Sequence, residues 1–415
     1  MQKKFKQLDL PRRSAEEIKA YYAKNAYLAK EPQVFTGREL NSIYKDWDAN
    51  YKSKGVLCSP VEYAAAINNL GMAILYQMVN EQEDLLMERA YMADSSFYNR
   101  LKKDKIPVGH SLESRHEFRD FDWVGFSCYF EIQFLNIIDM LYYSGIPIYT
   151  KDRTKEDPLV IMGGISAYSP AAIEENIDIV FIGDGEAQIL EFARAVGKYK
   201  NSDQSKHDFL LWVAQNIPGA YVPQFYTQRA GTTSYYGEEV GLTETGVPGG
   251  RWLEELGPLP EYADGPNKVP FPVVKAAFDI TKRPPFYKQL LPNIENNLLG
   301  YANIEISRGC HNSCRFCMAS AVHKPVREHD FEDLKKAIAE SPAYLGSSSI
   351  TPYSFNYSNH AQKNKISEYI ARATGKSVAT SSQRMDSYDK KLACAIVKTG
   401  HANATFGLES GSQRM

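Results

Sequence analysis

Three cysteines in the second half of the chain have the spacing C-x3-C-x2-C, at Cys310, Cys314 and Cys317. Thiolates spaced in this way on one short loop can each bind one iron of a cubane [4Fe–4S] cluster. The fourth iron then has no protein ligand and stays open to the amino and carboxylate groups of a small molecule. The spacing therefore predicts a cluster with one open corner, unlike the four-cysteine sites that only carry electrons.

The same residues leave a second interpretation open. In a zinc knuckle, the three thiolates would be joined by one of His311, His323 or His329. Zinc sites of this kind usually pair two C-x2-C knuckles, and the sequence has one such spacing, from Cys314 to Cys317. We therefore favour the iron–sulfur cluster.

The cysteine loop must be held by the elements around it. Residues 301–306 alternate polar and apolar side chains, which predicts a short strand that leads into the loop. The rest of the region 296–415 continues the pattern, with strands expected at 348–355, 377–382 and 402–408 and helices at 331–340, 363–374 and 388–398. Such βα units form TIM-like barrels. Because about four strands fit before Met415, we expect a partial barrel, either truncated or completed by a partner.

The cysteine loop after a first strand, with Phe316 directly before the last cysteine, resembles the signature of the radical S-adenosylmethionine (radical SAM) superfamily. The resemblance implies an enzyme that binds S-adenosylmethionine (SAM) at the open iron. It implies reductive cleavage of SAM to a 5′-deoxyadenosyl radical, which abstracts hydrogen from an unknown substrate. It also implies a reductant of the flavodoxin or ferredoxin type.

Candidate SAM-binding residues follow from position, because barrel sites gather at the carboxyl ends of the strands. Arg384 could pair with the SAM carboxylate, and Ser354 could contact the methionyl end. Glu409 could hold the ribose hydroxyls or the amino group. The alternatives are a surface ion pair of Arg384 with Asp386 and a helix N-terminal acid at Glu409.

Residues 51–200 alternate strand and helix patterns, which predicts a Rossmann-like parallel α/β sheet. The expected strands are 55–58, 90–91, 123–127, 159–164 and 177–182, with Ile146 and Ile148 at a further strand or its entrance, and the expected helices are 63–78, 97–103, 130–145, 170–176 and 187–199. Open parallel sheets bind ligands beyond the carboxyl ends of their strands. Small residues stand at three of these strand ends and make them candidates for a ligand site. The candidates, with the acidic neighbour of the last glycine, are Ser127, Gly163, Gly164, Gly183, Gly185 and Glu186.

This block resembles the cobalamin (B12)-binding domain found in some radical SAM proteins. The resemblance implies that the glycine loops line cobalamin and that methyl transfer is an outcome of the reaction. Many such domains carry Asp-x-His-x-x-Gly, and the matching turn 63–71 here has no histidine. Two interpretations stay open: cobalamin without a lower histidine ligand, or a fold that has lost the cofactor.

Two further segments complete the predicted organisation. Residues 1–50 are expected to form an N-terminal docking segment that opens with a capped helix from Ser14 to about Leu28, and residues 201–295 a connector. With the segments 35–41, 124–127, 217–223 and 325–328, nearly the whole chain resembles one uncharacterised family of radical SAM proteins with a B12-binding-like domain.

Composition excludes several classes of protein. The 415 residues carry a net charge of −2, so nothing in the overall charge favours nucleic acid or an anionic membrane. No apolar run is long enough to span a membrane, and six cysteines, three of them clustered, fit a reducing cytoplasm. A methylthiotransferase-like RNA-modifying enzyme is disfavoured, because no upstream three-cysteine domain or basic C-terminal module is present. A cofactor-binding protein made inert by truncation stays open.

Overall fold

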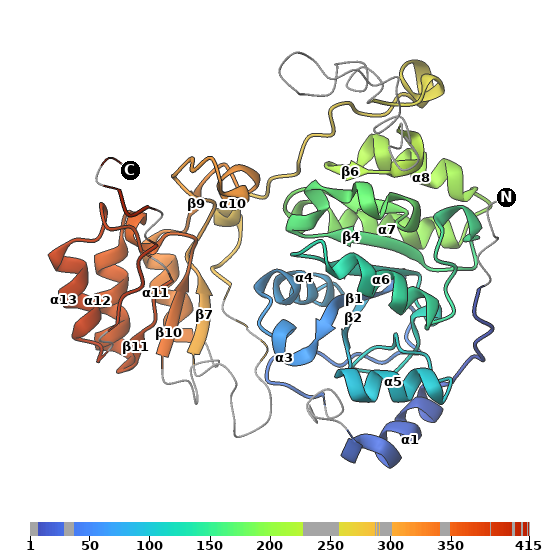
Figure 1. Cartoon of the computed structure of the whole chain (residues 1–415), viewed down its shortest axis with the longest axis horizontal. Helices are drawn as coiled ribbons and strands as arrows, with labels where there is room; N and C mark the ends of the chain where they lie inside the picture. The colour runs from blue at the N-terminus through green and yellow to red at the C-terminus, as the bar shows by residue number, and fades with distance from the viewer. Residues whose placement is uncertain are drawn as a thin grey trace. The chain divides into compact units, whose positions relative to one another are not determined.

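The computed structural model describes residues 7–28, 37–226, 257–286, 288, 290, 301–340, 349–381, 383–400, 403–407, 410–412 and 414. The chain divides into two compact units (Figure 1). The first, called the sheet unit below, comprises Met1–Gly37, Ile43–Ala66 and Leu75–Phe278. The second, called the cysteine unit, comprises Arg38–Ser42, Ile67–Ile74 and Asp279–Met415.

The sheet unit is built on six strands in the order β2-β1-β3-β4-β5-β6. Their bounds are β1 Ser53–Glu62, β2 Leu85–Met92, β3 Trp123–Ser127, β4 Leu159–Gly163, β5 Ile179–Phe181 and β6 Ala220–Tyr221. All neighbours pair in parallel except β5 and β6, which are antiparallel. The predicted α/β fold with a largely parallel sheet is therefore confirmed.

Helices cover both faces of this sheet, as a parallel sheet requires. They are α1 Ala15–Asn25, α3 Tyr63–Ala66, α4 Leu70–Asn80, α5 Ser95–Lys103, α6 Gln133–Tyr142, α7 Ile189–Lys200 and α8 Lys206–Asn216. On one face, Val124 and Val160 share a core with residues of α1, α5 and α6. On the other face, Trp123 packs edge-on against Phe192 of α7, with ring centroids 5.8 Å apart.

The sheet unit departs from the predicted elements in four places. The helix expected over 63–78 is two helices, because Asn69 Oδ1 accepts the Met72 amide (3.2 Å) and starts α4 afresh. The expected helix 170–176 is two short 3-10 turns, and Ile146 and Ile148 lie in no strand. Residues 206–221, expected in a connector, form α8 and β6, and β6 joins the sheet.

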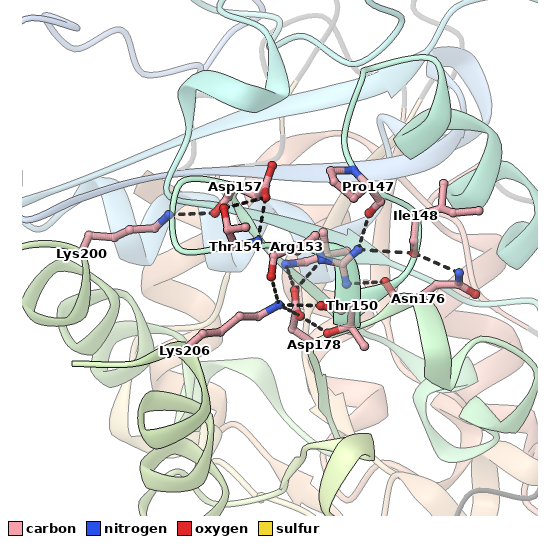
Figure 2. Close-up of polar contacts among 11 residues, drawn as sticks. Pro147, Ile148, Thr150, Arg153, Thr154, Asp157, Asn176, Asp178, Lys200 and Lys206 are labelled. Carbon is pink, nitrogen blue, oxygen red and sulfur yellow. Dashed lines mark hydrogen bonds and ion pairs between the residues drawn. The ribbon is translucent and has the colours of Figure 1, made fainter. Parts of the chain in front are cut away.

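A buried ion-pair network joins β4 and β5 at their amino ends (Figure 2). Asp178 comes directly before β5, and its carboxylate accepts from the Val160 amide (2.8 Å) and from Arg153 Nε (3.0 Å). Lys206 of α8 supplies a second cation, with Nζ 2.9 Å from Oδ1. Burial alone would raise the pKa of Asp178, but Arg153 and Lys206 outweigh it and hold the pKa below its usual value.

The cysteine unit has a smaller, fully parallel sheet in the order β11-β10-β7. Its strands are β7 Tyr301–Glu305, β10 Ser349–Tyr353 and β11 Ser377–Val378, and its helices are α10 Met318–Val322, α11 Phe331–Glu340, α12 Lys363–Thr374 and α13 Lys390–Val397. Figure 1 shows α11, α12 and α13 together on this sheet. The predicted βα order therefore appears in the described part of this unit.

The alternation that predicted β7 also sets its two faces. Ala302, Ile304 and Ile306 are buried in one apolar core with residues of α11, α12 and α13. Asn303 pairs in register with Thr351 of β10, and Glu305 with Tyr353, so polar side chains share the opposite face.

The expected fourth strand is not formed by the described residues 403–407. Phe406 makes a single parallel bridge to Gln383, and Gln383 N donates to the Thr405 carbonyl at 2.7 Å. One bridge does not make a strand, so among the described residues of the cysteine unit the sheet ends at β11. In neither unit is any described helix both long enough and apolar enough to cross a membrane.

Candidate functional site

The cysteine loop runs over 309–326 and is closed at its base. Strand β8, Ser307–Arg308, pairs antiparallel with β9, Arg327–Glu328, on the far side of the loop. Between them, Gly309 has φ +93°, and a Cβ there would lie 2.6 Å from the His323 carbonyl oxygen. Only glycine allows the two ends of the loop to approach so closely.

Inside the loop, the three thiols are free and half-buried. The Cys317 amide donates to the Cys314 carbonyl (3.0 Å), and Ser320 Oγ donates to the carbonyls of Cys314 (3.2 Å) and Cys317 (2.8 Å). The backbone of the second and third cysteines is therefore held by the start of α10. Asn312 Nδ2 lies 3.6 Å from Cys310 Sγ.

The loop is not arranged around one metal ion. Within the described ranges, no group of three His, Cys, Asp or Glu side chains gathers where a single ion could be held. His311 Nε2 lies 3.2 Å from a Glu328 carboxylate oxygen, and the His323 ring packs against Phe355. His329 is buried, 2% exposed, behind β7 and β9. This arrangement does not favour the zinc interpretation, whereas the thiolates of a cubane bind different irons and need not meet at one point.

A buried ion-pair cluster lies at the base of the loop, and the sequence interpretation missed it. Glu305, the last residue of β7, is 3% exposed and contacts both Arg283 and Arg308. Burial alone would raise the pKa of Glu305, but Arg308 and Arg283 hold it below its usual value. The only signal in the sequence was a charged residue at the end of a strand. Its partner Arg283 lies 22 positions away, too far for a local pattern to link the two residues.

Arg384 lies beyond β11, near the loop. Its guanidinium grips Asp386, with Nε 2.9 Å from Oδ1, as the alternative interpretation expected. This hydrogen bond is the main cause that raises the pKa of Arg384, and the sulfurs of Cys314 and Cys310 act in the same direction. Arg384 is therefore close enough to the cysteine loop to respond to its charge, although its present partner is Asp386.

The other two candidate SAM-binding residues are Ser354 and Glu409. Ser354, directly after β10, is buried: its Oγ accepts the Asn356 amide (3.2 Å), and its carbonyl accepts Ser381 Oγ (3.0 Å). Its hydroxyl therefore already serves the turn that follows β10. Glu409 lies outside the described residues.

The chain itself closely approaches Gly164, Gly183 and Gly185 at the strand ends of the sheet unit, but not Gly163. Ser127 pairs in register with Gly163, where a Cβ would meet only the Phe181 oxygen at 3.9 Å. Gly164 has φ +100°, and a Cβ there would lie 2.2 Å from the Cys128 carbonyl oxygen. This glycine is needed because the chain packs against it, so it gives no sign of a ligand.

The next turn is filled in the same way. A Cβ at Gly183 would lie 2.1 Å from the Ala276 oxygen, and one at Gly185 would lie 2.9 Å from Leu75 Cδ1. Ala276 also bonds by its backbone on both sides of Gly183, to Ile182 (2.9 Å) and Asp184 (2.9 Å). The segment around Ala276 thus packs against Gly183, one of the turns where cobalamin was expected, so this turn does not fit that cofactor.

Glu186 lies beside this turn and helps to line a groove of about 580 Å³ along α7 and α8. Its lining combines the apolar residues Leu190, Phe209 and Trp212 with the cations Arg194 and Lys198. None of the strand-end glycines is among the lining residues, so this groove does not join Glu186 to them in one site.

Residues 71–223 match the model of a family described as "Radical SAM proteins, N-terminal". The match covers most of the sheet unit and stops well before the cysteine loop. No curated protein matches the chain.

Proposed function

We propose that this chain, which belongs to the radical SAM superfamily, is an enzyme that holds a [4Fe–4S] cluster on Cys310, Cys314 and Cys317 and cleaves SAM there. The observation that carries the proposal is a coincidence of two independent features. The family match lies in 71–223, and the cysteine spacing lies on a closed loop in the other unit.

The donor set suits the cluster. Three thiols on one loop, half-exposed and not bonded to each other, are the ligands that iron–sulfur clusters take, and they leave one iron open. When bound, such a cluster supplies the electron that splits SAM into methionine and a 5′-deoxyadenosyl radical, which takes hydrogen from a substrate C–H bond. The electron comes from a reductant, for which we propose a flavodoxin- or ferredoxin-type protein.

Around the loop, the chain's own residues would bind and orient SAM. Arg384 would exchange Asp386 for the carboxylate of SAM, which keeps the same two-pronged contact. Phe316, 70% exposed beside Cys317, offers a ring face on which a purine can stack. Ser354, directly after β10, and Glu409 remain proposed contacts of SAM.

We propose that β7, β10 and β11 begin a TIM-like barrel whose interior is the polar face. In support, Asn303 and Thr351 face away from the helices that cover the apolar side. The substrate would enter from that face. We assign no step to cobalamin, because Gly164, Gly183 and Gly185 are each filled by the chain's own atoms.

The test is anaerobic reconstitution of the full chain with iron and sulfide, followed by SAM and dithionite. We expect cluster absorbance and the release of 5′-deoxyadenosine, measured by chromatography. Cys314→Ala should abolish both, since one iron loses its only protein ligand. Cys394→Ala is the matched control, because Cys394 lies exposed on α13 and should leave both unchanged. A wild-type chain that takes up zinc but no iron, or a Cys314→Ala variant that still forms 5′-deoxyadenosine, would refute the proposal.

A further inference from the structure

Glu305 ends β7 and Arg308 ends β8, so their contact lies where the cysteine loop leaves the sheet. Arg308 donates to Glu305 Oε1 from both Nε (2.9 Å) and Nη2 (2.7 Å). Arg283 contacts the other carboxylate oxygen from the segment before β7. The side chains of Arg308 and Glu305 are only 13% and 4% exposed.

We propose that Arg308 is a positioning residue for the iron–sulfur cluster, acting through its two-pronged grip on Glu305. This inference rests on the proposed function, because it concerns the loop that would hold the cluster. Arg308 does not ligate iron. It fixes the backbone immediately before Gly309, and so fixes the first cysteine, which follows one residue later.

Strand pairing alone is a weak anchor for this loop. The β8–β9 ribbon consists of two residue pairs, Ser307 with Glu328 and Arg308 with Arg327, and an isolated two-stranded ribbon is marginally stable in water. The guanidinium of Arg308 adds a second attachment, directed at a carboxylate that belongs to β7. The start of the loop is therefore tied to the edge of the larger sheet as well as to its own far end.

The charges at the base of the loop also support this role for Arg308. One carboxylate against two guanidiniums leaves a surplus of one positive charge at the base of the loop. Arg308 and Cys310 are two residues apart, so their Cα atoms lie within about 7 Å of each other. A cubane bound by three thiolates is anionic and gains a further negative charge on reduction, so this surplus favours the reduced cluster.

The experiment compares wild-type protein with Arg308→Lys and Arg308→Gln after anaerobic reconstitution. Lysine keeps the charge and loses the fork, whereas glutamine loses both. We expect both variants to load iron but to release it to a chelator at least tenfold faster than the wild type. We also expect the electron paramagnetic resonance spectrum of the reduced cluster to broaden in both. The midpoint potential should fall in Arg308→Gln and stay near wild type in Arg308→Lys.

The matched control is Arg153→Lys, which alters the guanidinium fork of the other buried carboxylate, Asp178. Arg153→Lys should lower thermal stability. In chains that carry the cluster, it should not change the rate of iron release, the electron paramagnetic resonance spectrum or the midpoint potential. If Arg308→Lys matches the wild type in iron release and spectrum, the inference is overturned while the proposed function stands. If the wild type loads no cluster, it is the proposed function that fails. Should Arg308→Gln not fold, the result for Arg308→Lys decides alone.

Discussion

Asp178 in the sheet unit and Glu305 in the cysteine unit are built alike, each a buried carboxylate held by two cations. They differ in their place along the strand. Asp178 precedes β5, at the amino end of the sheet, where its partners all belong to the surrounding framework (Figure 2). Glu305 ends β7, and its partner Arg308 directly precedes the cysteine loop. We therefore expect the same local chemistry to serve stability at one end of a strand and the proposed site at the other.

The sharpest way to test this comparison is to neutralise the carboxylate in each unit. Asp178→Asn should destabilise the sheet unit by about 3–5 kcal/mol, because Arg153 is left buried without its counter-charge. Denaturant unfolding would measure the loss. The cluster content per folded chain should not change. Glu305→Gln should cost a similar free energy but also lower cluster content, and equal cluster loss in both variants would erase the distinction.

A change of pH sharpens the comparison, because a buried histidine responds where the two carboxylates do not. Burial lowers the pKa of His110, which contacts Tyr22, from about 6.5 to about 3. A depressed pKa means that the stability is fully present above pH 6.5 and is lost as the pH falls toward 3. From pH 7 to pH 5 we expect His110 to contribute a loss of about 2 kcal/mol, while buried Glu88, whose pKa is raised to about 7, acts in the opposite direction.

Both carboxylates have lowered pKa values and stay charged over this range, so neither ion-pair network contributes to the loss. Unfolding monitored at each pH would measure the slope of the free energy of unfolding against pH. His110→Gln should lose the part of this slope that His110 contributes, and an unchanged slope in that variant would exclude His110 as a source.

The smallest effect should come from removing one cation and leaving a balanced pair. Lys206→Met leaves Asp178 with Arg153, and we expect a loss of roughly 1.5 kcal/mol, measured by the shift of the denaturant midpoint. Iron release should be unaffected. Arg308→Gln leaves the equivalent pair of Glu305 with Arg283, so a change in iron release that appears in Lys206→Met as well would contradict our division of roles.

Local patterns predicted much of the fold. The strand over 123–127 and the helices over 331–340 and 363–374 have the predicted bounds, since each has clear periodicity between turn residues. Ser14 and Glu17 form the expected capping box, with Glu17 N donating to Ser14 Oγ at 3.2 Å and Ser14 N donating to Glu17 Oε2 at 2.8 Å.

The features that the sequence did not predict involve residues whose contacts lie far away in the sequence. Position 183 needs glycine because Ala276 packs against it, and no local pattern links the two residues. The partner of Glu305 is Arg283, brought there only when the chain folds. The cysteine spacing gives a proposed ligand set, but the base of its loop could be seen only in three dimensions. Of the expected fourth strand, the described residues 403–407 form one bridge at Phe406, and their alternation alone could not show this.

The close approach at Gly309 has one more consequence. Because the loop departs and returns at the same place, its interior can change shape while β7 and α11 keep theirs. Gathering iron would then be a rearrangement confined to 310–322, without strain passed to the hydrophobic interior behind it. Any side chain at position 309, by contrast, would force apart the two ends of the loop.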